Sequence, residues 1–241
     1  MSSFKVRGLG IAVGAALAAL VVTNANASLV TNGDFANIGS VWVNNTGLGS
    51  DDLQYSGATD IPGWTNVPGY VNEFWFTSPN DYSLSASPGN GSTFAVDLTG
   101  QANNKPYGGI EQTITTVAGE GYELTFDLGA STYWNSSGFG AAALTASANG
   151  TSLLNSQLFT LTPDSTNEWV TDTLSFTADS SSTTIEFLAD SSYTSKYVGL
   201  DNVNVNVSAV PEPSTWTMLL AGLGGLAAAI RFRRKRVSAT A

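Results

Sequence analysis

The chain has 241 residues, with 9 Lys and Arg against 19 Asp and Glu, no His and no Cys. The absence of His and Cys excludes Ser-His-Asp and Cys-His nucleophiles and the usual zinc sites. Between Ser28 and Val210 stand 18 acidic residues but only Lys105 and Lys196, a formal charge of −16. A surface of that sign repels phosphate backbones, which excludes nucleic-acid binding, and it favours solubility and divalent cations.

The N-terminus, residues 1–27, is typical of a signal peptide. Lys5 and Arg7 form a positive region, an apolar stretch follows, and Ala25-Asn26-Ala27 supplies the small side chains, those of Ala25 and Ala27, that signal peptidase requires. We expect signal peptidase to be a partner during export and the mature chain to begin at Ser28. An uncleaved signal anchor is the alternative.

Residues 28–208 are predicted to form one β-domain. Apolar and polar residues alternate in 94–98, 123–128 and 184–189, which is the period of half-buried antiparallel strands. Further strands are predicted at 70–76, 110–117, 142–148, 152–161, 169–178 and 198–207. Short strands with frequent turn residues predict an all-β fold, an antiparallel β-sandwich of the jelly-roll type.

Three local features refine this prediction. Asn149-Gly150 is a two-residue hairpin signal, because both central residues must adopt positive φ. The apolar parity shifts within 198–207, which predicts a bulge near Asp201-Asn202. Residues 39–60 lack clear alternation, so they form either a lid-like loop or an edge strand around 41–43.

Aromatic residues in or beside predicted loops are candidates for glycan binding. Flat rings stack on the apolar faces of sugars, while nearby Asn and Asp side chains accept hydrogen bonds from hydroxyl groups. The candidates are Trp42, Trp75, Tyr133 and Trp134. Tyr133-Trp134 ends one predicted strand and enters a polar loop, which favours exposure. By contrast, we expect Trp64 and Trp169 to fill the sandwich core.

Asp34 and Asp201 are candidate ligands for a structural Ca²⁺ ion, because the first and last strands neighbour each other in jelly rolls of this type. Ca²⁺ takes about six to eight oxygen ligands, so two carboxylates need help from other oxygens. In the alternative interpretation both side chains only accept hydrogen bonds in turns.

A pair of carboxylates is the remaining catalytic option. The candidates for such a pair are Glu73, Glu111, Glu123, Glu168 and Glu186. Glu123 and Glu186 alternate with apolar residues and therefore have the pattern of ordinary solvent-facing strand positions. We predict that the protein is not an enzyme and has no catalytic residue.

The C-terminal tail, residues 209–241, combines a Pro-Glu-Pro motif in 210–214, an apolar run at 216–230 and a basic cluster at 231–236. Fifteen apolar residues make a helix of about 23 Å, which is short of a hydrocarbon core of about 30 Å. The basic cluster should stop transfer and stay in the cytoplasm, leaving the domain outside. The tail is therefore predicted to be a transient inner-membrane helix, with a plain single-span anchor as the alternative.

This tail resembles the PEP-CTERM sorting signal of Gram-negative bacteria that make exopolysaccharide. The resemblance rests on Pro211-Glu212-Pro213, the short Gly/Leu/Ala-rich segment and the terminal Arg cluster, which stand in the same order. It implies recognition by an exosortase near Pro211, Glu212 and Pro213, with the helix discarded or exchanged.

The middle of the chain also resembles a known family. The motifs are LVTNGDF (29–35), IPGWT (61–65), FAVDLTG (94–100), GIEQTITT (109–116), GYELTF (121–126) and GLDNV (199–203). Their succession is similar to a family of unknown function first noted in plant cell-wall proteins, and to its bacterial choice-of-anchor C relatives. The resemblance implies a galactose-binding-like sandwich related to carbohydrate-binding modules. The family usually has Glu at the position of Ala36 in this chain. This difference weakens any metal site that would be carried over from the family.

Together these features predict an exported, non-enzymatic protein of the cell surface or the biofilm matrix. Extracellular polysaccharide is the expected partner, and exosortase and signal peptidase act during export. The alternative is a structural or adhesive matrix protein that binds other proteins and no glycan.

Overall fold

We describe the fold from a computed structural model. The residues that it describes are 27–37, 39, 50–53, 61–67, 73–77, 85–89, 91–99, 107–130, 141–151, 154–165, 167–190, 192–193, 197–208 and 221–225. In β1 and β3 this description covers the backbone alone.

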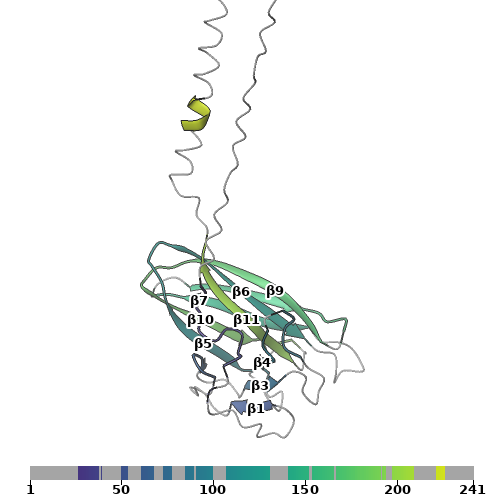
Figure 1. Ribbon diagram of the computed structural model, residues 1–241. Coiled ribbons are helices and arrows are strands. Elements are labelled where there is room, and N and C mark those ends of the chain that lie inside the picture. The colour runs from purple at the N-terminus through teal and green to yellow at the C-terminus, as the bar shows by residue number, and fades with distance from the viewer. Residues whose placement is uncertain are drawn as a thin grey trace, which may run out of the picture.

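The described residues form eleven strands in two facing sheets (Figure 1). The six-stranded sheet has the order β1 (Ser50–Leu53), β3 (Glu73–Thr77), β4 (Phe94–Asp97), β11 (Val198–Val207), β6 (Gly121–Ala130) and β9 (Glu168–Thr177). The five-stranded sheet has the order β2 (Thr65–Asn66), β5 (Gly109–Thr115), β10 (Ser182–Ala189), β7 (Ala142–Asn149) and β8 (Leu154–Leu161). Every pairing among these strands is antiparallel, which confirms the predicted sandwich.

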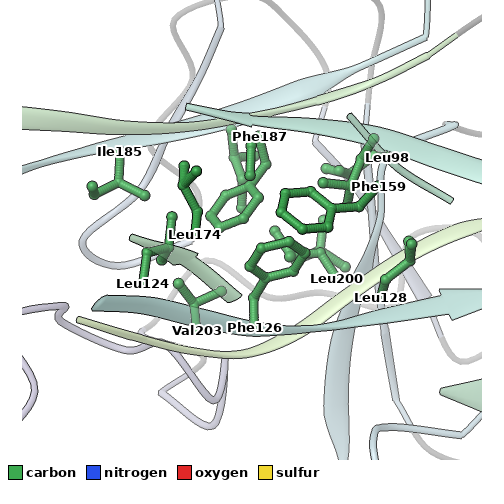
Figure 2. Close-up of a cluster of buried hydrophobic side chains, with 14 of the residues drawn as sticks. Leu98, Leu124, Phe126, Leu128, Phe159, Leu174, Ile185, Phe187, Leu200 and Val203 are labelled. Carbon is green, nitrogen blue, oxygen red and sulfur yellow. The ribbon is translucent and has the colours of Figure 1, made fainter. Parts of the chain in front are cut away.

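The space between the sheets is filled by one apolar cluster. Phe126 from β6 lies edge-on to Phe159 and Phe187, with ring centroids 5.1 and 5.0 Å away, and Figure 2 shows these rings pointing toward one another. Trp64 is only 2% exposed and packs against Phe35 and Phe187. The prediction that Trp64 lies in the core is therefore confirmed.

The longest strands follow the alternation of the sequence. In β6 the apolar residues at even positions face the core, while the residues between them face away from it. β11 occupies the predicted range 198–207, and its register shifts between Asp201 and Asn204. Asn202 adopts a positive φ of 51° at this point, so the predicted bulge is confirmed.

One local prediction differs from the structure, and a second is covered only in part. The hairpin at Asn149-Gly150 is not a two-residue turn, because Asn149 pairs with Leu154 and four residues lie between them. Asp179 accepts a hydrogen bond from the Thr151 N–H at 2.9 Å, which holds the longer loop from outside the hairpin. Within 39–60, an edge strand is present at β1, whereas residues 41–43 lie outside the described residues.

The two ends of the sandwich lie side by side. The Leu29 N–H donates to the Val205 carbonyl at 2.9 Å, and Ser28 Oγ accepts from the N–H groups of Val30 and Val205 at 3.1 and 3.3 Å. Of the predicted apolar helix at 216–230, the structure describes residues 221–225, which are helical. Among the described residues, no helix is both long and apolar enough to cross a membrane.

Candidate functional site

The face of the six-stranded sheet that points away from the core, hereafter the outer face, carries a tryptophan that lies flat on two glycines. Gly199 of β11, Gly129 of β6 and Trp169 of β9 stand opposite one another on adjacent strands. A Cβ atom on Gly129 would come within 2.7 Å of Trp169 Cζ3, and one on Gly199 within 2.8 Å of Cη2. The indole therefore covers both glycines, and its other face points away from the sheet.

A short segment, residues 85–87, crosses the outer face beside this ring and is called the strap below. Trp169 Nε1 donates to the Ser85 carbonyl at 3.1 Å and to Asn167 Oδ1 at 3.2 Å, and Asn167 Nδ2 donates to Ser85 Oγ. Ala86 and Ala95 form a second apolar cluster, against which Trp169 and Tyr197 pack. The strap thereby fixes the edge of the indole and leaves Trp169 half-buried.

The strap is fastened to two buried carboxylates. Asp127 and Asp201 stand opposite each other on β6 and β11, and they are 4% and 0% exposed. Ser87 donates its N–H to Asp201 Oδ2 at 2.8 Å and its hydroxyl to Asp127 Oδ2. Buried carboxylates are costly unless hydrogen bonds compensate for the lost water, so Ser87 stabilises both acids and is itself held in place by them.

Further donors complete this network. Thr171 Oγ1 donates to Asp127 Oδ1 at 2.6 Å, and the Asn202 N–H donates to Asp201 Oδ1 at 2.7 Å. The positive φ of Asn202 belongs to the β11 bulge, which turns this N–H toward the preceding carboxylate. The bulge therefore helps to hold the acid pair.

A third buried acid, Asp97 on β4, stands opposite Gly199. Its Oδ1 accepts from Thr99 N at 2.9 Å, Thr99 Oγ1 at 2.7 Å and Val198 N at 3.2 Å. Burial nevertheless raises the pKa of Asp97 from 3.8 to about 7, because removal of water outweighs these hydrogen bonds. Burial, together with the negative charge of Asp97, also raises the pKa of Tyr107.

Beyond Trp169, the outer face of β9 presents a column of exposed hydroxyl residues, Thr171, Thr173 and Ser175. Their partners on β6 are Asp127, Thr125 and Glu123. The outer face thus combines a flat ring with a row of hydroxyl and carboxylate groups. This combination can stack on the apolar side of a sugar and exchange hydrogen bonds with its hydroxyls.

With this geometry established, the comparison with known families is decisive. Residues 28–206 match the family model described as "Protein of unknown function (DUF642)". This chain belongs to the DUF642 family. Residues 209–235 match the model of the PEP-CTERM protein-sorting motif, which indicates export and processing by an exosortase in a Gram-negative bacterium.

Solved structures share the fold of the DUF642 domain at low identity. An arabinose-bound α-L-arabinofuranosidase is 12% identical, with a TM-score of 0.50 over 78% of this chain but only 28% of that one. A CBM4 structure is 14% identical, with a TM-score of 0.38 over 74% of this chain and 99% of that one. The CBM22-1 xylan-binding domain of Paenibacillus barcinonensis Xyn10C is 13% identical, with a TM-score of 0.41 over 67% of this chain and 94% of that one. No curated protein matches the sequence. The likeness to the arabinofuranosidase shows the fold alone.

The two predicted calcium ligands of the DUF642 domain have different partners. Asp34 Oδ1 accepts from the Ala36 N–H at 3.2 Å within a turn, while both oxygens of Asp201 accept backbone N–H groups. The segment that carries Asp34 does meet β11, because the Val203 N–H donates to the Gly33 carbonyl at 2.8 Å. In the described ranges no three acidic side chains gather as a metal site. Both side chains therefore accept hydrogen bonds, as the alternative interpretation expected. Calcium binding stays a prediction.

The predicted aromatic residues cannot be placed in the same way. Trp42, Tyr133 and Trp134 lie outside the described residues, and Trp75 belongs to β3, where only the backbone is described. The segment with Tyr133 and Trp134 follows β6, which ends at Ala130, one residue beyond Gly129. Their contribution to glycan binding stays a prediction.

Both processing sites fall mainly outside the described residues. Pro211, Glu212 and Pro213 are outside them, as is Ala25, whereas Ala27 is described and exposed. The assignment of the sorting motif therefore depends on the family match rather than on geometry.

Trp169 is the residue of the candidate site that the sequence prediction misplaced, since it lies on the outer face and not in the main core. The signal was its position: Leu174 and Phe176 fill the core from even positions of β9, so an odd position such as 169 points the other way. Gly129 and Gly199 were a second signal, because glycine within a strand often marks a close approach.

Glu111 and Glu186 are the one pair of the candidate catalytic carboxylates found opposite each other within the described part of the chain. They face each other on β5 and β10, in the other sheet. Burial and the charge of Glu111 raise the pKa of Glu186. The absence of enzymatic activity stays a prediction.

Proposed function

We propose that the DUF642 domain binds extracellular polysaccharide through the outer face of the six-stranded sheet. In this proposal the protein is exported, sorted to the cell surface or the matrix, and not an enzyme. The observation that carries the proposal is the flat, half-buried indole of Trp169 on Gly129 and Gly199. A ring held in this way can stack on a sugar without losing side-chain entropy on binding, because the strap already orders it.

The arrangement of the polar groups supports the same proposal. Thr171 donates its hydroxyl to Asp127, and beyond it the exposed residues Thr173 and Ser175 continue along β9, so a chain of several sugars could follow the strand. Tyr133 and Trp134, which follow β6 in the sequence, keep their predicted part in glycan binding in this proposal. A protein partner would be expected to use a broader apolar surface, which is the alternative function of an adhesive matrix protein.

The test is retention of residues 28–208 on purified exopolysaccharide and on a glycan array, with Trp169→Ala as the binding variant. Loss of a stacking ring should cost about 1–3 kcal/mol of binding free energy, or roughly 5- to 150-fold in Kd. Leu158→Ala is the matched control, since Leu158 is a 43% exposed apolar residue on the other sheet. If no glycan retains the wild-type domain, the protein-binding alternative replaces the proposal.

A further inference from the structure

The outer face continues beyond the strap as two rows of polar side chains, hereafter the polar rows, that cross β11, β6 and β9. The first row is Asn204, Thr125 and Thr173, and the second is Asn206, Glu123 and Ser175. Val203 and Val205 belong to the core, so the asparagines on either side of Val205 project from the outer face. Glu123, Thr173 and Ser175 are exposed and the other three residues are half-buried, which leaves both rows accessible to a ligand.

The two asparagines carry acceptors that no donor reaches. Asn204 Oδ1 and Asn206 Oδ1 are the buried side-chain atoms that lack a hydrogen-bond partner in the described part of the chain. Asn32, by contrast, donates from Nδ2 to the Asn37 and Pro62 carbonyls and accepts at Oδ1 from the Asn37 N–H. A buried acceptor without a donor destabilises the folded state, because it has lost its contact with water. Asn204 and Asn206 therefore do not have the stabilising role that Asn32 has.

An amide side chain matches the hydroxyl groups of a sugar. Nδ2 provides two donors and Oδ1 an acceptor, while each hydroxyl can both donate and accept. The torsion that carries the amide is broad, so rotation about it can turn either atom toward a ligand. The two amides stand two residues apart on β11, about 7 Å along the strand, and can therefore contact different positions of an extended chain.

The polar rows continue the site that begins at Trp169. Thr173 and Ser175 lie on the same strand as the ring, and Ser175 is about 20 Å along β9 from it. β6 separates β9 from β11, so the amides stand about 10 Å across the sheet from these hydroxyls. A polysaccharide chain that passes from the ring onto the polar rows lies between the hydroxyl groups of β9 and the amides of β11.

We propose that Asn204 and Asn206 bind hydroxyl groups of the polysaccharide that stacks on Trp169, and thereby determine which sugars the outer face accepts. This inference rests on the proposed function, because it names further residues of the same site. A ligand hydroxyl donates to Oδ1 or accepts from Nδ2, and a sugar without a hydroxyl at that position leaves the amide unpaired, which discriminates against it. A protein partner fits less well, because the cores of protein interfaces are enriched in aromatic residues and the polar rows contain none.

The experiment measures binding and stability of the same variants. Asn204→Ala and Asn206→Ala are compared with the wild-type exported protein by affinity electrophoresis through gels that contain purified exopolysaccharide, xylan, galactomannan or hydroxyethyl cellulose. In a polymer that retains the wild type and binds Trp169→Ala less tightly, we expect each variant to bind roughly 2- to 12-fold more weakly, as for the loss of one hydrogen bond. The melting temperature without glycan should stay unchanged or rise by up to about 4 °C, because an unpaired acceptor is removed.

Asn155→Ala is the matched control. Asn155 is half-buried on β8 of the other sheet, and its Nδ2 donates to the Ala148 carbonyl at 3.3 Å. This variant loses a hydrogen bond that the folded state makes. It should therefore melt at the same or a lower temperature and bind every polymer as the wild type does.

The outcomes separate the inference from the proposed function. An unchanged Kd for either variant, or a fall in melting temperature larger than that of Asn155→Ala, would overturn the role of the two asparagines. The proposed function would then still stand if Trp169→Ala weakens binding. Retention of the wild type by none of the polymers, or full retention of Trp169→Ala, would overturn the proposed function and the inference with it.

Discussion

Adding one methyl group to Gly129 tests whether the ring of Trp169 lies where the structure places it. The new Cβ would lie 2.7, 2.8 and 2.9 Å from Cζ3, Cη2 and Cε3 of the indole. The ring cannot move away freely, because its Nε1 donates a hydrogen bond to the Ser85 carbonyl and Ala86 packs against it. Gly129→Ala must therefore displace the indole, the strap, or both.

The expected change in the free energy of unfolding is the balance of two effects. Overpacking of this kind costs about 1–3 kcal/mol, whereas replacing glycine by alanine in a strand contributes about 0.5–1 kcal/mol of stability. The free energy of unfolding should thus fall by roughly 0.5–2 kcal/mol, or about 1–8 °C in melting temperature for a domain of this size. Glycan binding should weaken at the same time, because the stacking surface moves.

Gly121→Ala is the matched control within the same strand. A Cβ at Gly121 would meet Ser208 Cβ at 3.5 Å, an ordinary contact, so this variant should be neutral or stabilising by about 0.5 kcal/mol. Thermal melting, near-ultraviolet circular dichroism and affinity electrophoresis measure stability, the environment of the tryptophans and binding.

The decisive step repeats Gly129→Ala in the Trp169→Ala background. With the indole removed there is nothing to overpack, so the same change should now be neutral or stabilising, and the double-mutant cycle should show a coupling of about 1–3 kcal/mol. If Gly129→Ala destabilises both backgrounds equally, the glycine does not serve to accommodate the ring, and the proposed packing of the Trp169 indole on Gly129 is wrong.

Four further predictions can be checked with standard measurements. Burial raises the pKa of Asp97 from 3.8 to about 7, so the folded state binds the Asp97 proton more tightly than the unfolded state does. The free energy of unfolding should therefore fall by up to ~4 kcal/mol as the pH rises from 3.8 to 7. Asp97→Asn should remove this dependence and flatten that part of a plot of melting temperature against pH. Trp64→Ala should cost about 3–5 kcal/mol in denaturant unfolding, because it empties a site between Phe35 and Phe187. Intact mass of the exported protein should show a start at Ser28 and loss of residues 216–241, and a retained basic cluster would favour a plain anchor. Calcium at a hundredfold excess over its Kd should raise the free energy of unfolding by about 2.7 kcal/mol, and Asp201→Ala should abolish this increase. Equal melting curves with calcium and with chelator would contradict the predicted metal site.

The sequence allowed prediction of strands whose pattern comes from burial on one face. β6, β10 and β11 alternate because each must cover the core, and even the bulge in β11 appears as a shift of parity. β1 and β2 could not be found in this way. Ser-Asp-Asp-Leu and Thr-Asn carry no alternation, and these residues are extended because they pair with β3 and β5.

The candidate site depends on register between strands that are far apart in sequence. Gly129, Trp169 and Gly199 align only because β6 pairs with both β9 and β11 at one particular register. Each residue gave a local hint, through its parity or through glycine within a strand, but their alignment is a property of the sheet. Long-range pairing of this kind cannot be read from the local pattern of a single sequence.

The buried acids explain why the outer face is built around a strap. Asp127 and Asp201 occupy positions that face away from the core, and they are nevertheless buried, with Ser87 of the strap hydrogen-bonded to both. The strap also holds the indole edge through Ser85 and its surroundings through Ala86. The carboxylates and the ring are therefore parts of one assembly, in which the cost of burying charge is offset by the hydrogen bonds that also hold the strap beside the indole.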